Sequence, residues 1–244
     1  MRIRFAVLAV LLATLPSPAF AQSEPISTAR MSLVVGRLPS VVDMPLFFRL
    51  YGVSLPAGQL LSYDASTAML YGLSGAATID IDGTARPIAE GAAVFIPAGK
   101  AVTIGASGSN PANLLLFVLT PRPNQRKPLL DRPAAVTELC RTPDPLPGLQ
   151  AGPYEMSLTR VTLPTGMPAD QPHFRSGAAL NYVLAGTGLF TVEGKTERRT
   201  VGMPDVELNG LVYQWANPGD APLVLLQANL SQEGMPAVLP ASTK

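Results

Sequence analysis

The chain has 244 residues, of which 18 are basic and 17 acidic, for a formal net charge of +1 at pH 7. A charge this close to neutral argues against nucleic acid or an anionic membrane as the partner, because both are bound through clustered positive charge. The length suffices for one large domain or two modest ones, each able to bury a hydrophobic core.

The first 21 residues have the pattern of a secretory signal peptide. Arg2 and Arg4 give a basic start, an apolar run follows, and the sequence AFA at 19–21 is a small-x-small cleavage signal before Gln22. The apolar run is too short to span a bilayer as a helix. Cleavage would remove two of the 18 basic residues and none of the 17 acidic ones, leaving a net charge of about −1. We therefore expect a periplasmic or secreted protein.

Cys140 is the only cysteine, so an internal disulfide is impossible. A nucleophilic cysteine needs a base nearby, and the surrounding sequence ELCRTPDP offers none. We interpret Cys140 as a buried or tolerated thiol, with an intermolecular disulfide as the open alternative.

Short apolar or alternating runs predict an all-β protein. Runs of about five to eight residues, such as AAVFIP, LLLFVL and GLFTVEG, recur between Gly, Pro, Asn and Asp, and no long helical period interrupts them. Two hairpins are expected, one turning at Asp82-Gly83 and one at Glu193-Gly194, because glycine supplies the positive φ that such turns require.

The chain also repeats itself. Four pairs of glycines share one offset of 111 residues, and YGLSGAATIDIDG aligns with YVLAGTGLFTVEG between them. The pairs are Gly75 and Gly186, Gly83 and Gly194, Gly91 and Gly202, and Gly99 and Gly210. The repeat predicts two tandem units, at 22–121 and 150–244. Residues 122–149 form a Pro-rich linker with at most one short helix, over 130–140, and the ends at 22–39 and 233–244 are tails or edge strands.

With these glycines the sequence resembles the cupin superfamily, in its two-domain bicupin form. The stretch GAAVFIPAGKAV fits the start of the second cupin motif through Gly91, Pro97 and Gly99, and the later stretch GMPDVELNGLVYQWAN keeps Gly202 and Gly210 of that motif. The resemblance implies two jelly-roll barrels, each with its site inside the barrel.

The metal ligands that the resemblance implies are mostly replaced. In the first unit the ligand positions hold Ser62, Asp64, Ala68 and Val102. In the second unit they hold His173, Arg175, Ala179 and Tyr213. A catalytic Zn, Fe or Mn site needs about three ligands, and a fixed guanidinium at one ligand position repels a divalent ion. We therefore expect degenerate motifs that bind no metal and no other cofactor.

A second-barrel site of a different kind is the main hypothesis. Strand side chains alternate between the interior and the exterior of a barrel, so the motif residues should share the interior. The candidate ligand-binding residues are His173, Arg175, Asn181, Tyr213 and Trp215. This mixture suits a small polar or anionic molecule, a carbohydrate-like one included, because the rings give apolar faces and the guanidinium clamps a carboxylate.

Three functions remain open on the sequence. The first is a non-catalytic exported module that binds such a ligand in the second barrel, with the first barrel as a packing partner or the contact of a homodimer. The second is metal-independent catalysis of the epimerase or isomerase kind, with His173 as base and Tyr213 as acid. In the third, the same residues fill the barrel by bonding to one another, and the protein has a purely structural or interaction role.

Overall fold

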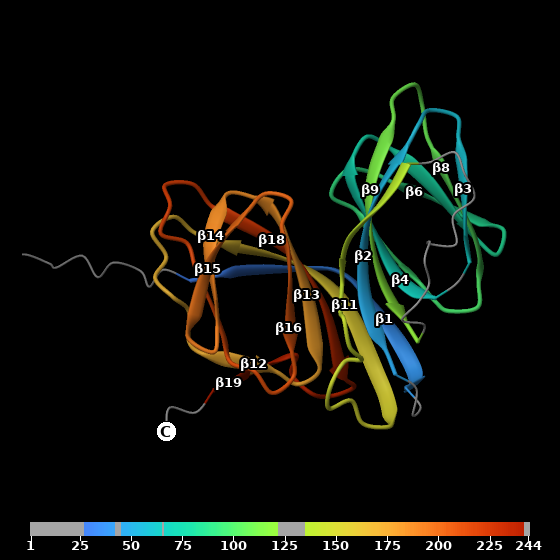
Figure 1. Ribbon diagram of the computed structural model, residues 1–244. Helices are drawn as coiled ribbons and strands as arrows, with labels where there is room; N and C mark the ends of the chain where they lie inside the picture. The colour runs from blue at the N-terminus through green and yellow to red at the C-terminus, as the bar shows by residue number, and fades with distance from the viewer. Residues whose placement is uncertain (1–26, 42–44, 65, 122–134, 242–244) are drawn as a thin grey trace, which may run out of the picture.

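The computed structural model describes residues 27–41, 45–64, 66–121 and 135–241, and its regular elements are all β-strands. Figure 1 shows two barrels side by side, one from each half of the chain. The fold class expected from the sequence is therefore confirmed as all-β. The signal peptide and residues 122–134 of the linker lie outside the described residues. The part of the chain that the structure describes has no helix that could span a membrane.

The first barrel consists of two antiparallel sheets. One has the strand order β3-β8-β5-β6 and the other the order β10-β2-β9-β4-β7. The strands are β2 (Phe47–Leu55), β3 (Leu60–Asp64), β4 (Thr67–Ser74), β5 (Ala77–Ile81), β6 (Thr84–Ile88), β7 (Ala93–Ile96), β8 (Ala101–Ala106), β9 (Ala112–Thr120) and β10 (Ala135–Arg141).

The second barrel repeats this plan with the sheets β1-β11-β18-β13-β16 and β15-β14-β17-β12-β19. The strands are β1 (Ala29–Val41), β11 (Gly152–Leu163), β12 (His173–Arg175), β13 (Ala178–Ala185), β14 (Thr187–Val192), β15 (Lys195–Thr200), β16 (Pro204–Leu208), β17 (Tyr213–Ala216), β18 (Leu223–Gln232) and β19 (Val238–Pro240). The expected hairpins β5–β6 and β14–β15 turn at Asp82-Gly83 and Glu193-Gly194, and all four turn residues have positive φ.

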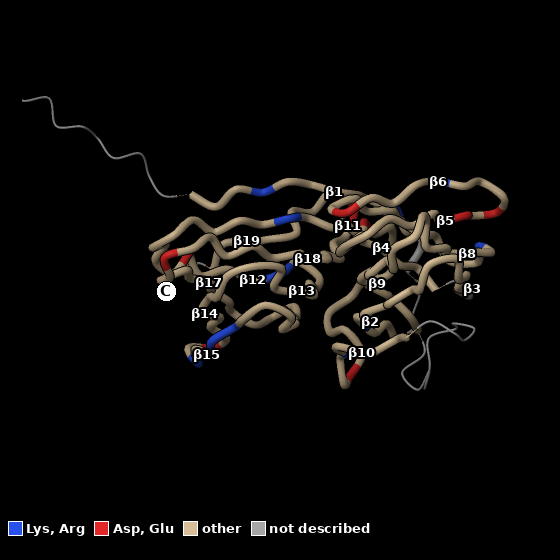
Figure 2. Tube along the Cα trace, turned by 90° about the horizontal axis from the view of Figure 1, so that it is seen from above, with Lys and Arg blue, Asp and Glu red and all other residues tan. Residues whose placement is uncertain are grey.

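The two halves exchange their first strands. Strand β1 precedes the first barrel in sequence, yet it pairs with β11 of the second barrel, from Ala29 opposite Thr162 onward. Strand β10 follows the first barrel in sequence and returns to pair with β2. Figure 1 and Figure 2 show β1 running along the second barrel toward the first. The exchange means that each barrel is completed by a segment that the repeat alone would assign elsewhere.

Alternation along the strands divides the buried apolar residues into three groups. One group lies inside the first barrel and includes Leu61, Ile79 and Leu116. A second, smaller group lies inside the second barrel around Trp215. The third lies between the barrels, where β2, β4 and β9 face β11, β13 and β18. The sheets between the barrels are thus buried on both faces, which explains their long apolar runs.

Two expectations need correction. The short helix expected over 130–140 is not formed in its described part, because residues 135–140 complete the sheet edge beside β2 as strand β10. Ser62 was expected inside the first barrel, but it is exposed while Leu61 and Tyr63 are buried. Tyr63 pairs with Val102, whereas the equivalent of Val102 in the second barrel, Tyr213, pairs with His173. The strand pairing of the first barrel is therefore shifted by one residue relative to the repeat. A shift of one residue moves each side chain of a strand to the opposite face.

Candidate functional site

The structure brings the five candidate residues together inside the second barrel. His173 and Arg175 come from β12, Asn181 from β13, and Tyr213 and Trp215 from β17. All five are buried, and none exposes more than 6% of its surface. Their buried neighbours include the polar residues Glu207, Gln227 and Asn229 beside the apolar group around Trp215, so part of this interior is charged and hydrogen-bonded.

The centre of this interior is Glu207 on β16, which is fully buried. Arg175 Nε donates to its Oε2 at 2.5 Å, while Asn181 Nδ2 and Trp215 Nε1 donate to its Oε1 at 2.8 Å and 3.0 Å. Three of the five candidate residues are therefore bound to one carboxylate. Arg175 has an internal anion as its partner, which satisfies a charge that would be costly to bury alone.

Hydrogen bonds extend from this centre toward β18 and β1. Arg175 Nη1 donates to Asn229 Oδ1 at 3.0 Å. Gln227 Nε2 donates to Asn181 Oδ1 at 2.8 Å, and Arg30 Nη1 on β1 donates to Gln227 Oε1 at 3.2 Å. The exchanged strand β1 thus contributes a side chain to the interior network of the second barrel.

The charge of Glu207 is held firmly in the folded protein. Burial alone would raise the pKa of Glu207, but the nearby Arg175 charge and the hydrogen bonds to the carboxylate outweigh it and hold the pKa well below its usual range. The ionised form of Glu207 is therefore favoured, and it forms an ion pair with Arg175.

His173 lies between two carboxylates. Its Nε2 is 3.6 Å from Glu207 Oε2, and its Nδ1 is 3.9 Å from Asp170 Oδ1 and 3.1 Å from the carbonyl oxygen of Gln171. Burial works against the charged imidazole, but Glu207 and Asp170 outweigh it, so the pKa of His173 is raised. The two carboxylates thus favour the protonated form of the His173 imidazole.

Tyr213 does not complete an acid–base pair with His173. Their ring centroids are 6.5 Å apart. The Tyr213 hydroxyl accepts from the backbone N–H of Leu208 at 2.6 Å and donates to the Leu208 carbonyl oxygen at 3.2 Å. Burial raises the pKa of Tyr213 to about 12. This hydroxyl therefore fixes the end of β16, while the Tyr213 ring stacks on Phe190 at 5.8 Å.

The donor atoms in the second barrel do not fit a cupin metal site. His173 and Glu207 are two potential ligands, but both Glu207 oxygens already accept hydrogen bonds, one of them from the Arg175 guanidinium. Within residues 27–41, 45–64, 66–121 and 135–241, no group of three or more His, Cys, Asp or Glu is placed to hold a metal ion. A divalent metal would have to displace Arg175 and overcome its charge.

Sequence reasoning missed Glu207, although the sequence held a signal for it. Glu207 lies directly opposite Ala179 on the paired strands β16 and β13. Ala179 occupies the position at which the resemblance expects the motif glutamate, so the carboxylate has moved to the neighbouring strand. Alternation along PDVEL puts Asp205 and Glu207 on one face, and two acids on one face of a buried strand indicate a polar interior.

Asp205 is neutralised separately from this centre. Arg199 Nε donates to both of its carboxylate oxygens, at 2.6 Å and 2.7 Å. Burial raises the pKa of Asp205 to about 6. Cys140, which was interpreted as an unreactive thiol, is half-buried on β10, and burial raises its pKa to about 11. Neither residue is placed to act with His173.

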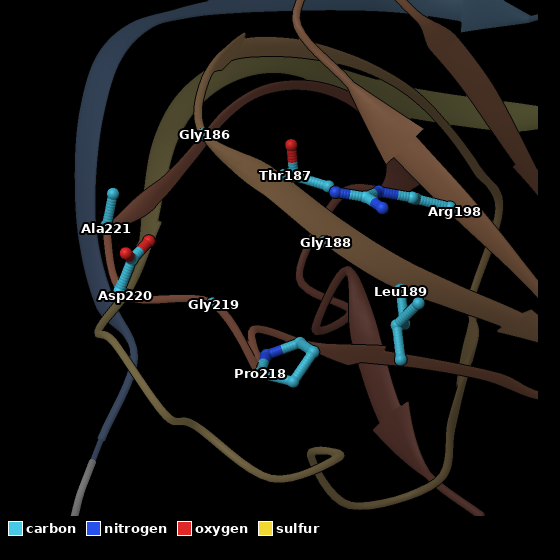
Figure 3. Close-up of a pocket in the computed structure, with 9 residues that line it drawn as sticks. All are labelled: Gly186, Thr187, Gly188, Leu189, Arg198, Pro218, Gly219, Asp220 and Ala221. Carbon is cyan, nitrogen blue, oxygen red and sulfur yellow. The ribbon is translucent and has the colours of Figure 1, made fainter.

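A hollow of about 420 Å³ also lies on the outside of the second barrel (Figure 3). Arg198 reaches over Thr187 on one side, and Asp220 stands on the other. The glycines in its wall have packing reasons of their own, because a Cβ at Gly186 would lie 2.4 Å from the Pro222 carbonyl oxygen. The glycine at 186 is therefore explained by the close packing of strand and turn.

Comparisons with known proteins agree with the architecture. Neither protein-family models nor curated proteins give a match. Among solved structures, an oxalate decarboxylase from Bacillus subtilis is similar with 15% identity and a TM-score of 0.55 over 82% of this chain and 72% of that chain. A salicylate 1,2-dioxygenase from Pseudoaminobacter salicylatoxidans is similar with 11% identity and a TM-score of 0.52, over 77% and 76% of the two chains.

Both of these are cupin-fold proteins, and the similarity extends over both barrels of this chain. The chain therefore has the cupin fold in its two-barrel form, as the resemblance implied. Identities this low show the fold alone, because one fold carries many chemistries.

Proposed function

We propose that the protein is an exported, non-catalytic module that binds a small polar or anionic molecule at its second barrel. The observation that carries the proposal is the contrast between the two interiors of one chain. The first barrel is filled mainly by apolar side chains, and its buried charge is Arg49, which donates to the Tyr51 hydroxyl. The second buries charged and amide side chains, which cost more to desolvate than apolar ones of the same volume. A polar interior that stability does not require is best explained by recognition.

The charges around this interior favour an anion. Arg175 and a protonated His173 lie close to Glu207, and Arg30 and Asp170 are near enough to influence the same groups. With all five charged, three cations face two anions. Burial raises the pKa of Asp170, which further weakens the negative side. A small carboxylate or a polyhydroxylated molecule with an acidic group would balance this excess.

A thermal-shift screen of the mature protein tests the proposal directly. A ligand that binds only the folded state raises the melting temperature by mass action. We expect small carboxylates or acidic sugars to raise it, and the conservative variant Ile79→Val in the first barrel to show the same shift. If no member of a panel of carboxylates, phosphate and sugars shifts the parent protein, the binding proposal is wrong.

The structural alternative rests on the Arg175–Glu207 pair. Because Arg175 already has an internal carboxylate, this pair needs no ligand to be stable. Under that alternative the network fixes the geometry of the second barrel, and the protein acts through its surface.

The catalytic alternative is weaker, because the pKa of His173 is raised and the Tyr213 hydroxyl is bound to Leu208.

Export is a separate part of the proposal. It rests on the basic start, the short apolar run and the cleavage signal before Gln22. N-terminal sequencing of material from a periplasmic or culture fraction should begin at Gln22. A soluble cytoplasmic protein that retains Met1 would contradict export and leave the binding proposal untouched.

A further inference from the structure

We propose that Arg30, on the exchanged strand β1, is the residue that holds an anionic ligand at the edge of the second barrel, where β1 ends the sheet β1-β11-β18-β13-β16. The inference rests on the proposed function and names the contact residue and the ligand class, a small carboxylate or phosphate. Arg175 does not have this role, although the sequence favoured it, because Glu207 already neutralises it.

Arg30 differs from Arg175 in its access to solvent. Arg30 is exposed, whereas Arg175 is 1% exposed. An incoming ligand can therefore reach the Arg30 guanidinium without opening the barrel. A ligand that bound Arg175 would have to break the 2.5 Å bond to Glu207 and leave that carboxylate buried and unpaired.

The contacts of Arg30 leave its charge uncompensated. Its hydrogen bond within the described part of the chain goes to Gln227 Oε1 at 3.2 Å, a neutral acceptor. None of the described carboxylates lies within ion-pair distance of it. Although Arg30 as a whole is exposed, its guanidinium is partly buried, and this burial and the field of Arg175 lower the pKa of Arg30, whereas Asp170 and Glu207 raise it. The guanidinium thus lies near the charges of the network, and among the described residues no carboxylate pairs with it.

The position of Arg30 is fixed from both sides. Strand β1 pairs with β11, where Arg30 lies opposite Val161, a residue of the second barrel's apolar interior. Two residues earlier, the Thr28 hydroxyl contacts Met167 Sδ at 3.5 Å, and Met167 belongs to that interior too. Figure 2 shows β1 along the edge of the second barrel next to β11. Arg30 is therefore held at the edge of this sheet, here called the rim. At the rim its hydrogen bond to Gln227 connects it to the interior network.

Gln227 connects the rim to the interior. It accepts from Arg30 and donates to Asn181, and Asn181 donates to Glu207. A carboxylate at Arg30 would face a positive field from Arg175 and His173 without contacting either residue. A bidentate guanidinium contact of this kind is among the stronger charge-assisted hydrogen bonds, so loss of it should weaken binding by about ten-fold or more.

The strand also offers a matched control. Arg37 lies seven residues further along β1, is exposed, and is paired with Glu233 at 2.6 Å. Arg37→Gln removes the same charge from the same strand and leaves the rim of the barrel intact. Arg30→Lys keeps the charge but loses the two-pronged geometry, and it should bind with intermediate strength.

The test is calorimetric titration of the full mature protein with acetate, malonate and inorganic phosphate. We expect the parent and Arg37→Gln to bind at least one probe equally, and Arg30→Gln to bind it about ten-fold more weakly with an unchanged melting temperature. If Arg30→Gln binds as the parent does, the inference is wrong and the proposed function survives. If the parent binds none of the probes and the wider ligand screen also fails, the proposed function is wrong and the inference with it.

Discussion

The two barrels share a fold and a repeat of 111 residues, yet the second barrel buries many more polar side chains than the first. Val102 of the first barrel and Tyr213 of the second are equivalent by the repeat, and the strand pairing puts Tyr63 where the second barrel has His173. The first barrel is packed mainly by apolar side chains around one buried arginine, Arg49. The second barrel buries an ion pair, several amides and a histidine. This difference is the reason for proposing that the second barrel is the functional half of the molecule.

The largest expected effect comes from breaking the ion pair of the second barrel. Arg175→Met should lower the free energy of unfolding by about 3–5 kcal/mol, because it leaves Glu207 charged and unpaired in the interior. Urea denaturation of the parent and the variant measures this difference. The double variant Arg175→Met with Glu207→Leu should recover part of the loss, since no buried charge remains. A cost below about 1 kcal/mol for Arg175→Met would contradict the buried pair.

A conservative change in the first barrel should have a moderate effect of a different kind. Ile79 is fully buried among apolar residues. Ile79→Val removes one methylene group and should cost about 1 kcal/mol, with the same value at every pH between 5 and 8. A marked pH dependence of this cost would show that a titrating group affects the packing around Ile79, contrary to this expectation.

A smaller, pH-dependent effect should distinguish the second barrel. The pKa of His173 is raised above its ordinary value of 6.5, so the folded state holds this proton more tightly than the unfolded state. Its contribution to stability is complete below pH 6.5 and is lost as the pH rises through the folded-state pKa. Denaturation midpoints from pH 6 to 9 should fall for the parent and stay flatter for His173→Gln.

Asp205 acts in a separate and lower pH window. Burial raises its pKa from 3.8 to about 6, so its contribution is likewise present at low pH and lost by about pH 6. Asp205→Asn should therefore change the pH dependence of stability between about 4 and 6 and leave the region above 6.5 to His173. Equal slopes for His173→Gln and the parent above pH 6.5 would rule out His173 as the titrating group.

The smallest effect is expected from metal removal. Since both Glu207 oxygens accept hydrogen bonds from Arg175, Asn181 and Trp215, we expect purified protein without an affinity tag to hold no stoichiometric Fe, Mn or Zn. Chelator treatment should leave the melting temperature unchanged. About one metal ion per chain, lost together with stability on chelation, would overturn this description of the site.

The glycine repeat predicted two tandem units from the sequence, because these glycines mark turns whose backbone needs positive φ. The resemblance to the cupin superfamily implied that each unit is a barrel, and alternation along the motif strands then predicted that one interior holds His173, Arg175, Asn181, Tyr213 and Trp215. The repeat and the alternation are local features, since they follow from the backbone period of a strand and from the turn that ends it.

The features that the sequence did not predict depend on which strands become neighbours. Glu207 matters because β16 lies beside β13, and Arg30 matters because β1 crosses to the other barrel. Ser62 was misplaced because a difference of one residue between the halves reverses the alternation. Strand exchange and register are decided by contacts between residues far apart in the sequence, and a single chain carries no direct signal for them.

Trp215 offers the most direct test of the central claim, that the second barrel recognises a small anion. It is the only tryptophan, it is buried, and its Nε1 donates to Glu207 Oε1 at 3.0 Å, so its fluorescence reports on this interior alone. Titration of the mature protein with malonate at pH 6.5 should change the emission in a saturable way. The change should persist in Arg37→Gln and weaken in Arg30→Gln. No saturable change in the parent with malonate, acetate or phosphate would contradict the claim.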